Sequence, residues 1–148
     1  MPPAHASYIN MTGIRSGRTG DLSRVLEIQA QSPQAAHWDP IHYLDHHFRV
    51  AEVEDRVVAF LVARAVYPGE WEILNLATDP PYRRKGFARC LVLDLLSSGA
   101  EAVFLEVRES NYVAKELYKS LKFIEVNVRK GYYRDPPESA IVLKFHSC

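Results

Sequence analysis

Apolar and polar residues follow two different periods along this chain, and each period predicts one kind of element. Six segments have the alternating or continuous apolar runs typical of strands: 48–53, 57–66, 71–77, 102–107, 124–129 and 140–145. Helical spacing appears from Leu22 onward, after Gly86, and over 111–122. The inward face of the first helix is predicted to consist of Leu22, Val25, Leu26 and Ile28 or Gln29. Asp39-Pro40 predicts a further short helix, because Asp caps helices and Pro is tolerated in the first turn.

The order of these elements predicts the fold class. Strands come first and then alternate with helices, which is typical of an α/β fold with a mixed sheet and helices on both faces. Ile14-Arg15 is expected to enter a first strand, whereas residues 1–13 lack a clear period and are expected to be flexible in part. With 148 residues and no internal repeat or linker, the chain is predicted to form a single domain over 1–148.

The segment Arg83-Arg84-Lys85-Gly86-Phe87-Ala88-Arg89, called the basic loop below, lies between a predicted strand and a predicted helix. A glycine-containing loop at a helix N-terminus presents free backbone N–H groups and a partial positive charge. Phosphate binds well to such an arrangement, and flanking Arg and Lys add charge-assisted hydrogen bonds. A solvated surface turn would explain each basic residue singly, but the spacing favours a ligand that carries phosphate. Neither GxxxxGK[ST] nor GxGxxG occurs, so nucleoside triphosphatases and dinucleotide-binding proteins are not favoured.

Composition restricts the class of partner. Lys and Arg number 18, as do Asp and Glu, so the formal net charge is zero. General binders of nucleic acid or of membrane surfaces are usually basic, so we expect neither partner, and the basic loop is interpreted as a local site. The two cysteines, Cys90 and Cys148, make no disulfide framework. No signal peptide and no apolar run of about 18 residues is recognised. The expected location is the cytoplasm.

Glu106 is the first candidate for chemistry. It lies in a strand-like run whose alternation puts Phe104, Glu106 and Arg108 on one face and the aliphatic residues on the other. A carboxylate there costs free energy unless it is paired or lies in a solvated cleft. Two explanations remain open: a catalytic carboxylate, or an ordinary ion pair with Arg108 or with a neighbouring strand.

Tyr118 is the second candidate, on the inward stripe of the helix that follows. A tyrosine at such a position is more often a core residue than a catalyst. The neighbouring candidates favour a functional site, because Glu106 lies in the preceding strand and Asn111 begins the helix. Ligands of α/β sheets bind near strand ends and helix starts. The cluster of His37, His42, His46 and His47 has no HExxH pattern, so a polar helix face is favoured over a metal site, and no metal is expected.

Two stretches together resemble a known family. Leu74-Asn75-Leu76-Ala77-Thr78-Asp79-Pro80 followed by the basic loop is similar to the strand and acetyl-CoA loop of the GNAT acetyltransferases. Leu105-Glu106-Val107-Arg108-Glu109-Ser110-Asn111, with Ala114, Leu117-Tyr118, Leu121 and Phe123, resembles that family's C-terminal half. Together with Arg129-Lys130-Gly131-Tyr132-Tyr133, the pattern resembles more narrowly the RimI-like group, bacterial enzymes that acetylate the N-terminal alanine of a ribosomal protein. The resemblance extends over about residues 71–145 and is weak before them.

The resemblance implies a mainly antiparallel central sheet, acetyl-CoA as co-substrate and a protein or peptide N-terminus as partner. It assigns the general base to Glu106 and the general acid to Tyr118. Its implied cofactor-binding residues are Leu76, Ala77, Thr78, Arg83, Arg84, Lys85, Gly86, Phe87, Ala88, Arg89 and Asn111. Its implied substrate-binding residues are Trp38, whose segment Ala36-His37-Trp38 resembles the family's N-terminal helical part, and Tyr132 and Tyr133.

The sequence departs from the family pattern in two places, and it leaves several rival functions open. Ala88 replaces a glycine, and the helix after the basic loop is expected to be about one turn short, which puts peripheral partner contacts in doubt. Rival functions are a GNAT enzyme for a small amine or antibiotic, a non-catalytic acyl-CoA-binding regulatory module and, with least support, a nucleic-acid-binding module.

Overall fold

The structure is a computed structural model that describes residues 11–147 of the chain. The flexibility expected for residues 1–13 therefore falls mostly outside the described residues, and Met11–Gly13 belong to the first strand. The described strands are β1 (Met11–Ser16), β2 (His47–Val53), β3 (Arg56–Tyr67), β4 (Glu70–Thr78), β5 (Ala102–Arg108), β6 (Ile124–Arg134) and β7 (Pro137–His146). The α-helices are α2 (Leu22–Ala30), α3 (Phe87–Leu96) and α4 (Tyr112–Ser120). Three short 3₁₀ helices, η2 (Thr19–Asp21), η3 (Pro40–Asp45) and η4 (Pro80–Tyr82), complete the described elements.

The described strands form one sheet in the order β1-β2-β3-β4-β5-β7-β6. β4 and β5 run parallel and pair through Glu70–Glu72 and Ala102–Phe104, whereas β1/β2, β2/β3, β5/β7 and β6/β7 are antiparallel. The predicted mixed, mainly antiparallel α/β fold is therefore confirmed.

The chain divides into two compact units that share β3 and β4. The first unit consists of Met1–Arg64 and Leu74–Ser98, and the second of Ala65–Ile73 and Gly99–Cys148. The single domain over 1–148 remains a prediction.

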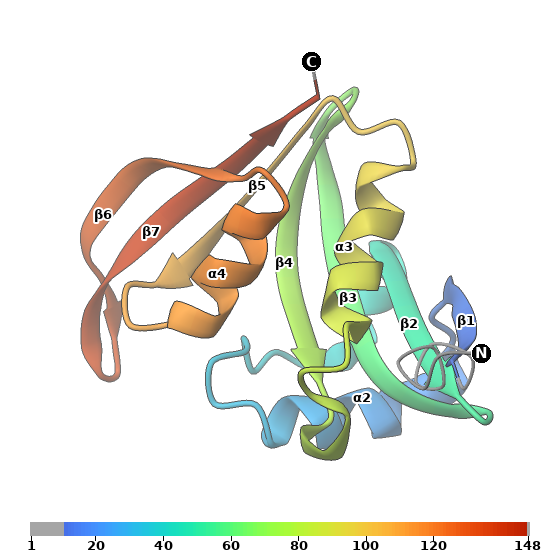
Figure 1. Ribbon diagram of the computed structural model, residues 1–148. Coiled ribbons are helices and arrows are strands. Elements are labelled where there is room, and N and C mark those ends of the chain that lie inside the picture. Colours follow the sequence, from blue (N-terminus) through green and yellow to red (C-terminus); the bar gives the residue numbers. More distant parts are fainter. Residues whose placement is uncertain (1–10, 148) are drawn as a thin grey trace. The chain divides into compact units, whose positions relative to one another are not determined.

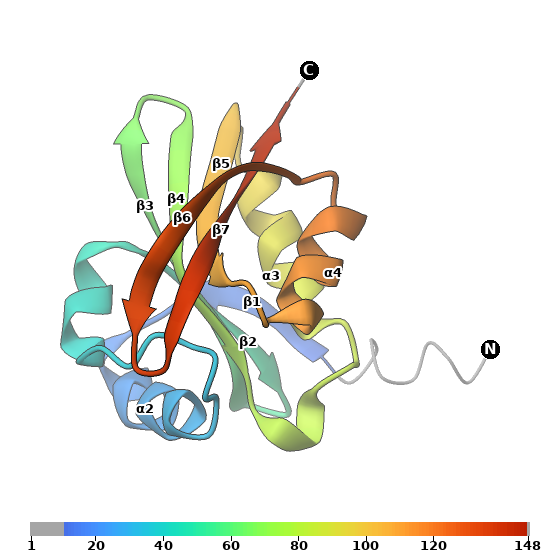
Figure 2. The same ribbon diagram turned by 90° about the vertical axis from the view of Figure 1, so that its left-hand side faces the viewer.

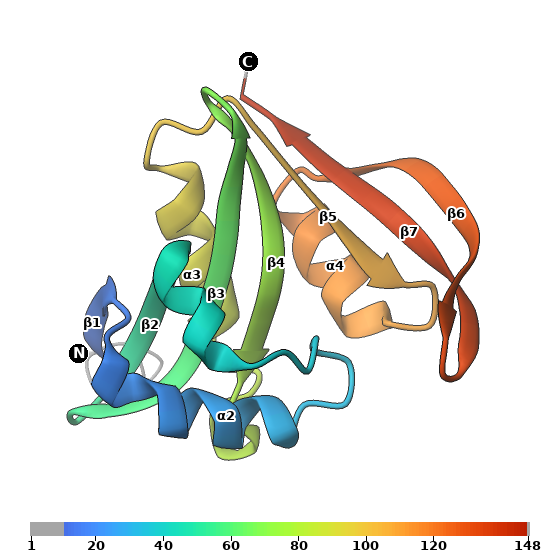
Figure 3. The ribbon, with the colours of Figure 1, turned by 180° about the vertical axis from the view of Figure 1, so that it is seen from behind.

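In the first unit, helices cover both faces of the sheet. Figure 1 shows α3 across one face, and Figure 3, seen from behind, shows α2 across the other. Covered on both faces, β3 is buried without a break from Val57 to Ala63. On the α2 face, Val25 and Ile28 pack with Phe60 and other buried residues of the sheet. The predicted inward face of α2 is wrong at Leu26, which is 51% exposed. Both Ile28 and its predicted alternative Gln29 are buried.

In the second unit, β5 is flanked by the long β6–β7 hairpin, which Figure 2 shows face on. The burial of β5 alternates as predicted, with Val103, Leu105 and Val107 buried and Glu106 half-buried on the other face. On α4, Tyr118 is buried and packs edge-on against Phe123, with ring centroids 5.1 Å apart. The sheet thus carries Glu106 at a fixed register, opposite Val142 of β7.

Candidate active site

The end of β4 is held in place by an ion pair that the sequence analysis did not identify. Asp79 is buried, and its backbone N–H donates to the Val58 carbonyl of β3 at 2.8 Å. Arg24 of α2 donates to the Asp79 carboxylate at 2.5 Å and to the Val57 carbonyl at 2.8 Å. The last residues of β4 are therefore fixed from both the sheet and the helix.

The backbone groups at the end of β4 point alternately to its two edges, and this separates Ala77 from Leu76 and Thr78. Successive N–H groups of an extended strand point to opposite edges. Since the Asp79 N–H points to β3, the N–H groups of Leu76 and Thr78 point to the other edge of β4. Ala77 is 7% exposed, and its side chain belongs to the core of the first unit. Leu76 and Thr78 thus present the backbone groups expected to pair with the pantetheine of a cofactor.

The basic loop leads directly into α3. Gly86 is the residue before the helix and has a left-handed backbone with φ of 90°, a region that glycine adopts without strain. Within the described part of the chain, the backbone N–H groups of Gly86, Phe87 and Ala88 have no acceptor. Phe87 is buried and anchors the helix start, so these N–H groups are held in a fixed array. Such an array fits a phosphate or pyrophosphate group.

The basic residues of the loop have different roles. The Arg83 guanidinium donates to the Thr78 carbonyl at 3.1 Å, to the Gln31 carbonyl at 2.9 Å and to the Ser32 hydroxyl at 3.2 Å. These bonds tie the loop to β4 and to the end of α2, which makes Arg83 a positioning residue. Arg84 and Lys85 have exposed side chains and carry the charge that a phosphate ligand meets. Arg89 is also exposed, in the first turn of α3.

Trp38 lies in the first unit, in the irregular segment between α2 and η3. Its side chain is 48% exposed, and its carbonyl accepts a hydrogen bond of 2.6 Å from the side chain of Gln29. This role of Gln29 is not predicted from the sequence, although a polar residue at a buried helical position is a sign of a specific partner.

Glu106, in the second unit, is paired with an arginine. Its carboxylate oxygens lie 3.0 and 3.2 Å from Nη1 of Arg129 on β6. The Glu106 side chain is 17% exposed, and that of Arg129 is 48% exposed. The partner is not Arg108, which instead donates to Glu138 and to the carbonyls of Asp135 and Pro136. An ion pair across the sheet therefore exists, and it involves both carboxylate oxygens of Glu106.

Two tyrosines of β6 lie beside these arginines. Arg129 stacks over the ring of Tyr132 at 4.2 Å, and Arg108 over that of Tyr133 at 4.3 Å. The two tyrosine rings contact each other edge to face, with centroids 5.1 Å apart. The pKa of Tyr133 is raised, chiefly by burial and then by the nearby Glu106 charge. Glu106, Tyr132 and Tyr133 thus form one polar and aromatic surface of the second unit.

Tyr118 lies on α4 of the same unit, and Asn111 is the residue that precedes this helix. Burial raises the pKa of the Tyr118 hydroxyl well above its usual range, so the phenol keeps its proton at neutral pH. The Asn111 side-chain oxygen accepts from the Ala114 N–H at 3.2 Å and so caps the helix. The amide nitrogen of Asn111 remains available as a donor, since the capping bond uses the oxygen.

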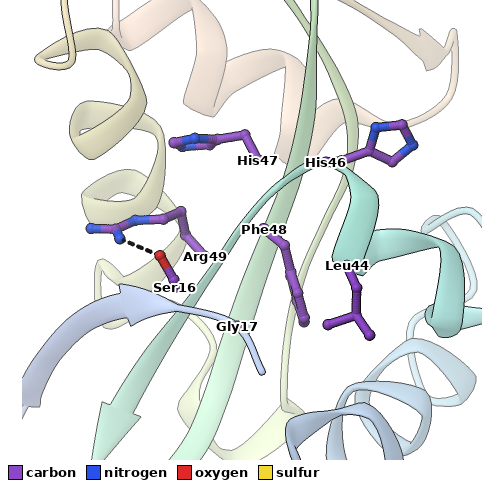
Figure 4. Close-up of a pocket in the computed structure, with 7 residues that line it drawn as sticks. All are labelled: Ser16, Gly17, Leu44, His46, His47, Phe48 and Arg49. Carbon is purple, nitrogen blue, oxygen red and sulfur yellow. Dashed lines mark hydrogen bonds between the residues drawn. The ribbon is translucent and has the colours of Figure 1, made fainter. Parts of the chain in front are cut away.

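The histidines do not share the polar helix face expected for their cluster. η3 is a 3₁₀ helix, and His46 lies beyond its end with extended backbone. His46 and His47 line a cavity of about 330 Å³ next to Ser16 and Arg49, apart from the predicted site residues (Figure 4). Burial, followed by the charge of Arg49, lowers the pKa of His47. Among residues 11–147, no group of three or more His, Cys, Asp or Glu side chains is arranged to hold a metal.

The structure thus gathers the predicted residues into two sets. The first unit brings together the β4 end, the basic loop and Trp38, and the second brings together Glu106, Asn111, Tyr118, Tyr132 and Tyr133. The first set has the donors for a phosphate-bearing thioester. The second has a carboxylate and a phenol, which are suited to proton transfer.

Comparison with known proteins gives the class. The family model described as Acetyltransferase (GNAT) family matches residues 20–123. That span covers most of the chain, and the chain therefore belongs to the GNAT family of acetyltransferases, which use acetyl-CoA as acetyl donor. The predicted acetyl-CoA-dependent acetyltransferase is confirmed at this level. In the part of the chain that the structure describes, no helix has the length and apolarity needed to span a membrane.

Particular relatives narrow the comparison. The chain is 32% identical to the [ribosomal protein bS18]-alanine N-acetyltransferase of Escherichia coli K12, over 90% of this chain and 96% of that protein. The crystal structure of the E. coli ribosomal-protein-S18-alanine N-acetyltransferase superimposes with a TM-score of 0.78 at 29% identity, over 90% and 92% of the two chains. Ard1 from Thermoplasma volcanium superimposes with a TM-score of 0.83 at 30% identity, over 94% and 99%. The predicted similarity to the RimI-like group is confirmed.

Proposed function

We propose that this protein transfers the acetyl group of acetyl-CoA directly to the N-terminal α-amino group of a protein, with a ribosomal protein that begins with alanine as the acceptor. The observation that carries this proposal is the 32% sequence identity, over 90% of the chain, to an enzyme named for that acceptor. The polar and aromatic surface around Glu106 supports it, because a protein N-terminus is a cation that needs a carboxylate and aromatic contacts. An acceptor of this kind would be met in the cytoplasm.

Donor binding is assigned to the first unit. The N–H groups of Gly86, Phe87 and Ala88 hold the pyrophosphate, and Arg84, Lys85 and Arg89 add positive charge. The backbone groups of Leu76 and Thr78 pair with the pantetheine, whereas those of Ala77 face β3. Arg83 keeps the loop in position through its bonds to Thr78, Gln31 and Ser32. Asn111 is also assigned to the cofactor, through its amide N–H₂ group.

Proton transfer is assigned to Glu106. An α-amino group has a pKa of about 8, so at neutral pH most of it is ammonium and has no lone pair for attack. Glu106 takes this proton, directly or through a water molecule. The free amine then forms the new C–N bond at the thioester carbon. Tyr132, Tyr133 and Trp38 contact the acceptor peptide and hold its amine in line, which removes much of the entropic barrier.

Breakdown of the thioester is assigned to the Leu76 N–H and Tyr118. Negative charge develops on the carbonyl oxygen during attack, and the Leu76 N–H stabilises it. The C–S bond then breaks, and the thiolate of coenzyme A takes the proton of the Tyr118 phenol. The nitrogen that attacked then gives up its extra proton to solvent, and Tyr118 regains a proton from solvent, so that the net reaction converts amine and acetyl-CoA into amide and coenzyme A.

An acceptor panel tests this proposal. The purified protein is supplied with acetyl-CoA and peptides that copy ribosomal-protein N-termini beginning with Ala, alongside the same peptides with a blocked N-terminus and a set of small amines. Thiol release and mass spectrometry should show one acetyl group on the N-terminal nitrogen of the unblocked peptides only. Faster turnover of small amines than of peptides would favour a small-amine enzyme, and tight acetyl-CoA binding without transfer would favour a regulatory module.

A further inference from the structure

Three buried polar side chains form a hydrogen-bonded cluster in the core of the first unit. Gln29, Tyr43 and Asn75 are 2%, 1% and 5% exposed. The Tyr43 hydroxyl donates to Gln29 Oε1 at 2.5 Å, and Asn75 Nδ2 lies 3.0 Å from the Tyr43 oxygen and 3.2 Å from Gln29 Oε1. Burial of such groups costs free energy unless each is satisfied, so a cluster of this kind is a specific rather than a general source of stability.

The cluster fixes the backbone of the segment that carries Trp38. The Asn75 amide pairs with Ala36 in both directions, because Nδ2 donates to the Ala36 carbonyl at 2.9 Å and Oδ1 accepts from the Ala36 N–H at 3.2 Å. Gln29 Nε2 donates to the Trp38 carbonyl. Ala36–Trp38 has no regular secondary structure of its own, so these three bonds, together with the contact of the His37 ring with the Ser32 carbonyl, hold the backbone from which the exposed Trp38 side chain projects.

Asn75 also contacts the backbone group to which the thioester is assigned. Its Oδ1 accepts a second hydrogen bond, 3.0 Å long, from the N–H of Leu76. This N–H points to the edge of β4 away from β3, where the proposed function requires it to meet the thioester carbonyl. A single side-chain oxygen therefore serves both the donor strand and the acceptor segment.

We infer that Asn75 is a positioning residue that couples acetyl-CoA binding to acceptor binding. This inference rests on the proposed function. When the thioester carbonyl takes the Leu76 N–H, Asn75 Oδ1 is left to the Ala36 N–H alone. That bond shortens, and Ala36–Trp38 becomes better ordered for the acceptor peptide. Acetyl-CoA thus raises the affinity for the peptide, and by linkage the peptide raises the affinity for acetyl-CoA by the same factor.

Two cofactor analogues separate this coupling from simple cofactor binding. Coenzyme A lacks the acetyl carbonyl, whereas acetonyl-CoA has a ketone in its place and cannot transfer it. Isothermal titration calorimetry gives the affinity of an Ala-beginning peptide in the presence of each analogue. The wild-type protein should bind the peptide about fivefold or more tightly with acetonyl-CoA than with coenzyme A, which is the lower range of typical coupling.

Variants then assign the coupling to Asn75. Asn75→Ala should bring the ratio of the two affinities close to one and raise the peptide KM, with the affinity for coenzyme A itself unchanged. Tyr43→Phe is the matched control, because it opens the same buried cluster but leaves the bonds of Asn75 to Ala36 and Leu76, and it should keep the ratio. A wild-type ratio in folded Asn75→Ala would overturn the inference.

The outcomes remain decisive if one variant does not fold. Equal peptide affinities with the two analogues in the wild-type protein would overturn the inference even if Asn75→Ala is insoluble. That result leaves the proposed function standing as long as the wild type acetylates the peptide. Failure of the wild type to acetylate any N-terminus would contradict the proposed function, and the inference would fall with it.

Discussion

Arg129 holds the Glu106 carboxylate from across the sheet, with Nη1 lying 3.0 and 3.2 Å from its two oxygens. β7 lies between their strands, so the pair joins two strands that are not neighbours. The same guanidinium covers the Tyr132 ring at 4.2 Å. Arg129 thus connects the proposed general base to an aromatic ring assigned to the acceptor. We infer that this ion pair mainly orients the Glu106 side chain and contributes less to the stability of the fold.

Replacing Arg129 with methionine should therefore affect activity more than stability. With the Arg129 side chain 48% exposed, the pair contributes at most about 1 kcal/mol to the free energy of unfolding. Turnover of an Ala-beginning peptide should fall by about tenfold or more, because Glu106 loses its fixed orientation. Urea denaturation and steady-state kinetics measure the two effects. Lys119→Met is the control, because it breaks the exposed ion pair with Glu125. It should change neither the free energy of unfolding nor the turnover much. A large loss of stability with unchanged turnover contradicts this assignment.

Tyr118→Phe should remove the part of the alkaline decrease in the free energy of unfolding that comes from the Tyr118 phenol. Burial raises the pKa of this phenol in the folded protein above the unfolded value of about 10. The contribution to stability is therefore fully present below pH about 10 and is lost as pH rises toward the folded-state pKa. Between about pH 9 and 11, the free energy of unfolding should fall more steeply for the wild type than for Tyr118→Phe. Tyr112→Phe, at a position that is 69% exposed, should follow the wild type.

The same variant separates catalysis from binding. Without the phenol proton the thiolate leaves less readily, so Tyr118→Phe should lower kcat by about a hundredfold while the acetyl-CoA dissociation constant stays within about twofold. Full turnover in this variant would remove Tyr118 from the mechanism and leave it as a core residue.

Charge on the basic loop should determine cofactor affinity. Arg84→Gln and Lys85→Gln each remove a cation beside the predicted phosphate site, and each should weaken acetyl-CoA binding by about tenfold, less at high salt. Arg56→Gln removes an exposed cation from the first position of β3 and should leave the affinity unchanged. Fluorescence or calorimetric titration at two salt concentrations measures the acetyl-CoA affinity of each variant. Equal effects of all three variants would mean that the loop acts only through general electrostatics.

Gly86→Ala should cost stability as well as affinity. Gly86 has φ of 90°, and a residue with a Cβ is disfavoured in this region by about 1–2 kcal/mol. The free energy of unfolding should fall by about that amount, and acetyl-CoA should bind more weakly because the N–H array shifts. Gly20→Ala is the control, because a Cβ there meets nothing within 4 Å. A stable variant with unchanged acetyl-CoA affinity would show that the loop backbone does not hold the phosphates.

Local pattern predicted much of the fold and part of the site. Alternation along 102–107 predicted that Glu106 faces away from the aliphatic side, and the glycine before an apolar helix predicted the start of α3. Contacts between distant residues were not predictable, because nothing local marks a partner. Arg129 is 23 positions from Glu106, and Gln29 is 46 positions from Asn75. Arg83 shows the same limit, since its sequence neighbours suggested a phosphate ligand while its guanidinium is bound to Thr78, Gln31 and Ser32.

Glu106→Gln tests the central claim most directly. The amide keeps the size of the side chain and much of its hydrogen bonding but cannot take the proton of an ammonium group. With an Ala-beginning peptide, the account predicts a fall in kcat of about 10²–10⁴-fold and an acetyl-CoA dissociation constant within about twofold of the wild type. Glu125→Gln on β6 should keep full activity. Wild-type turnover in Glu106→Gln would contradict the account.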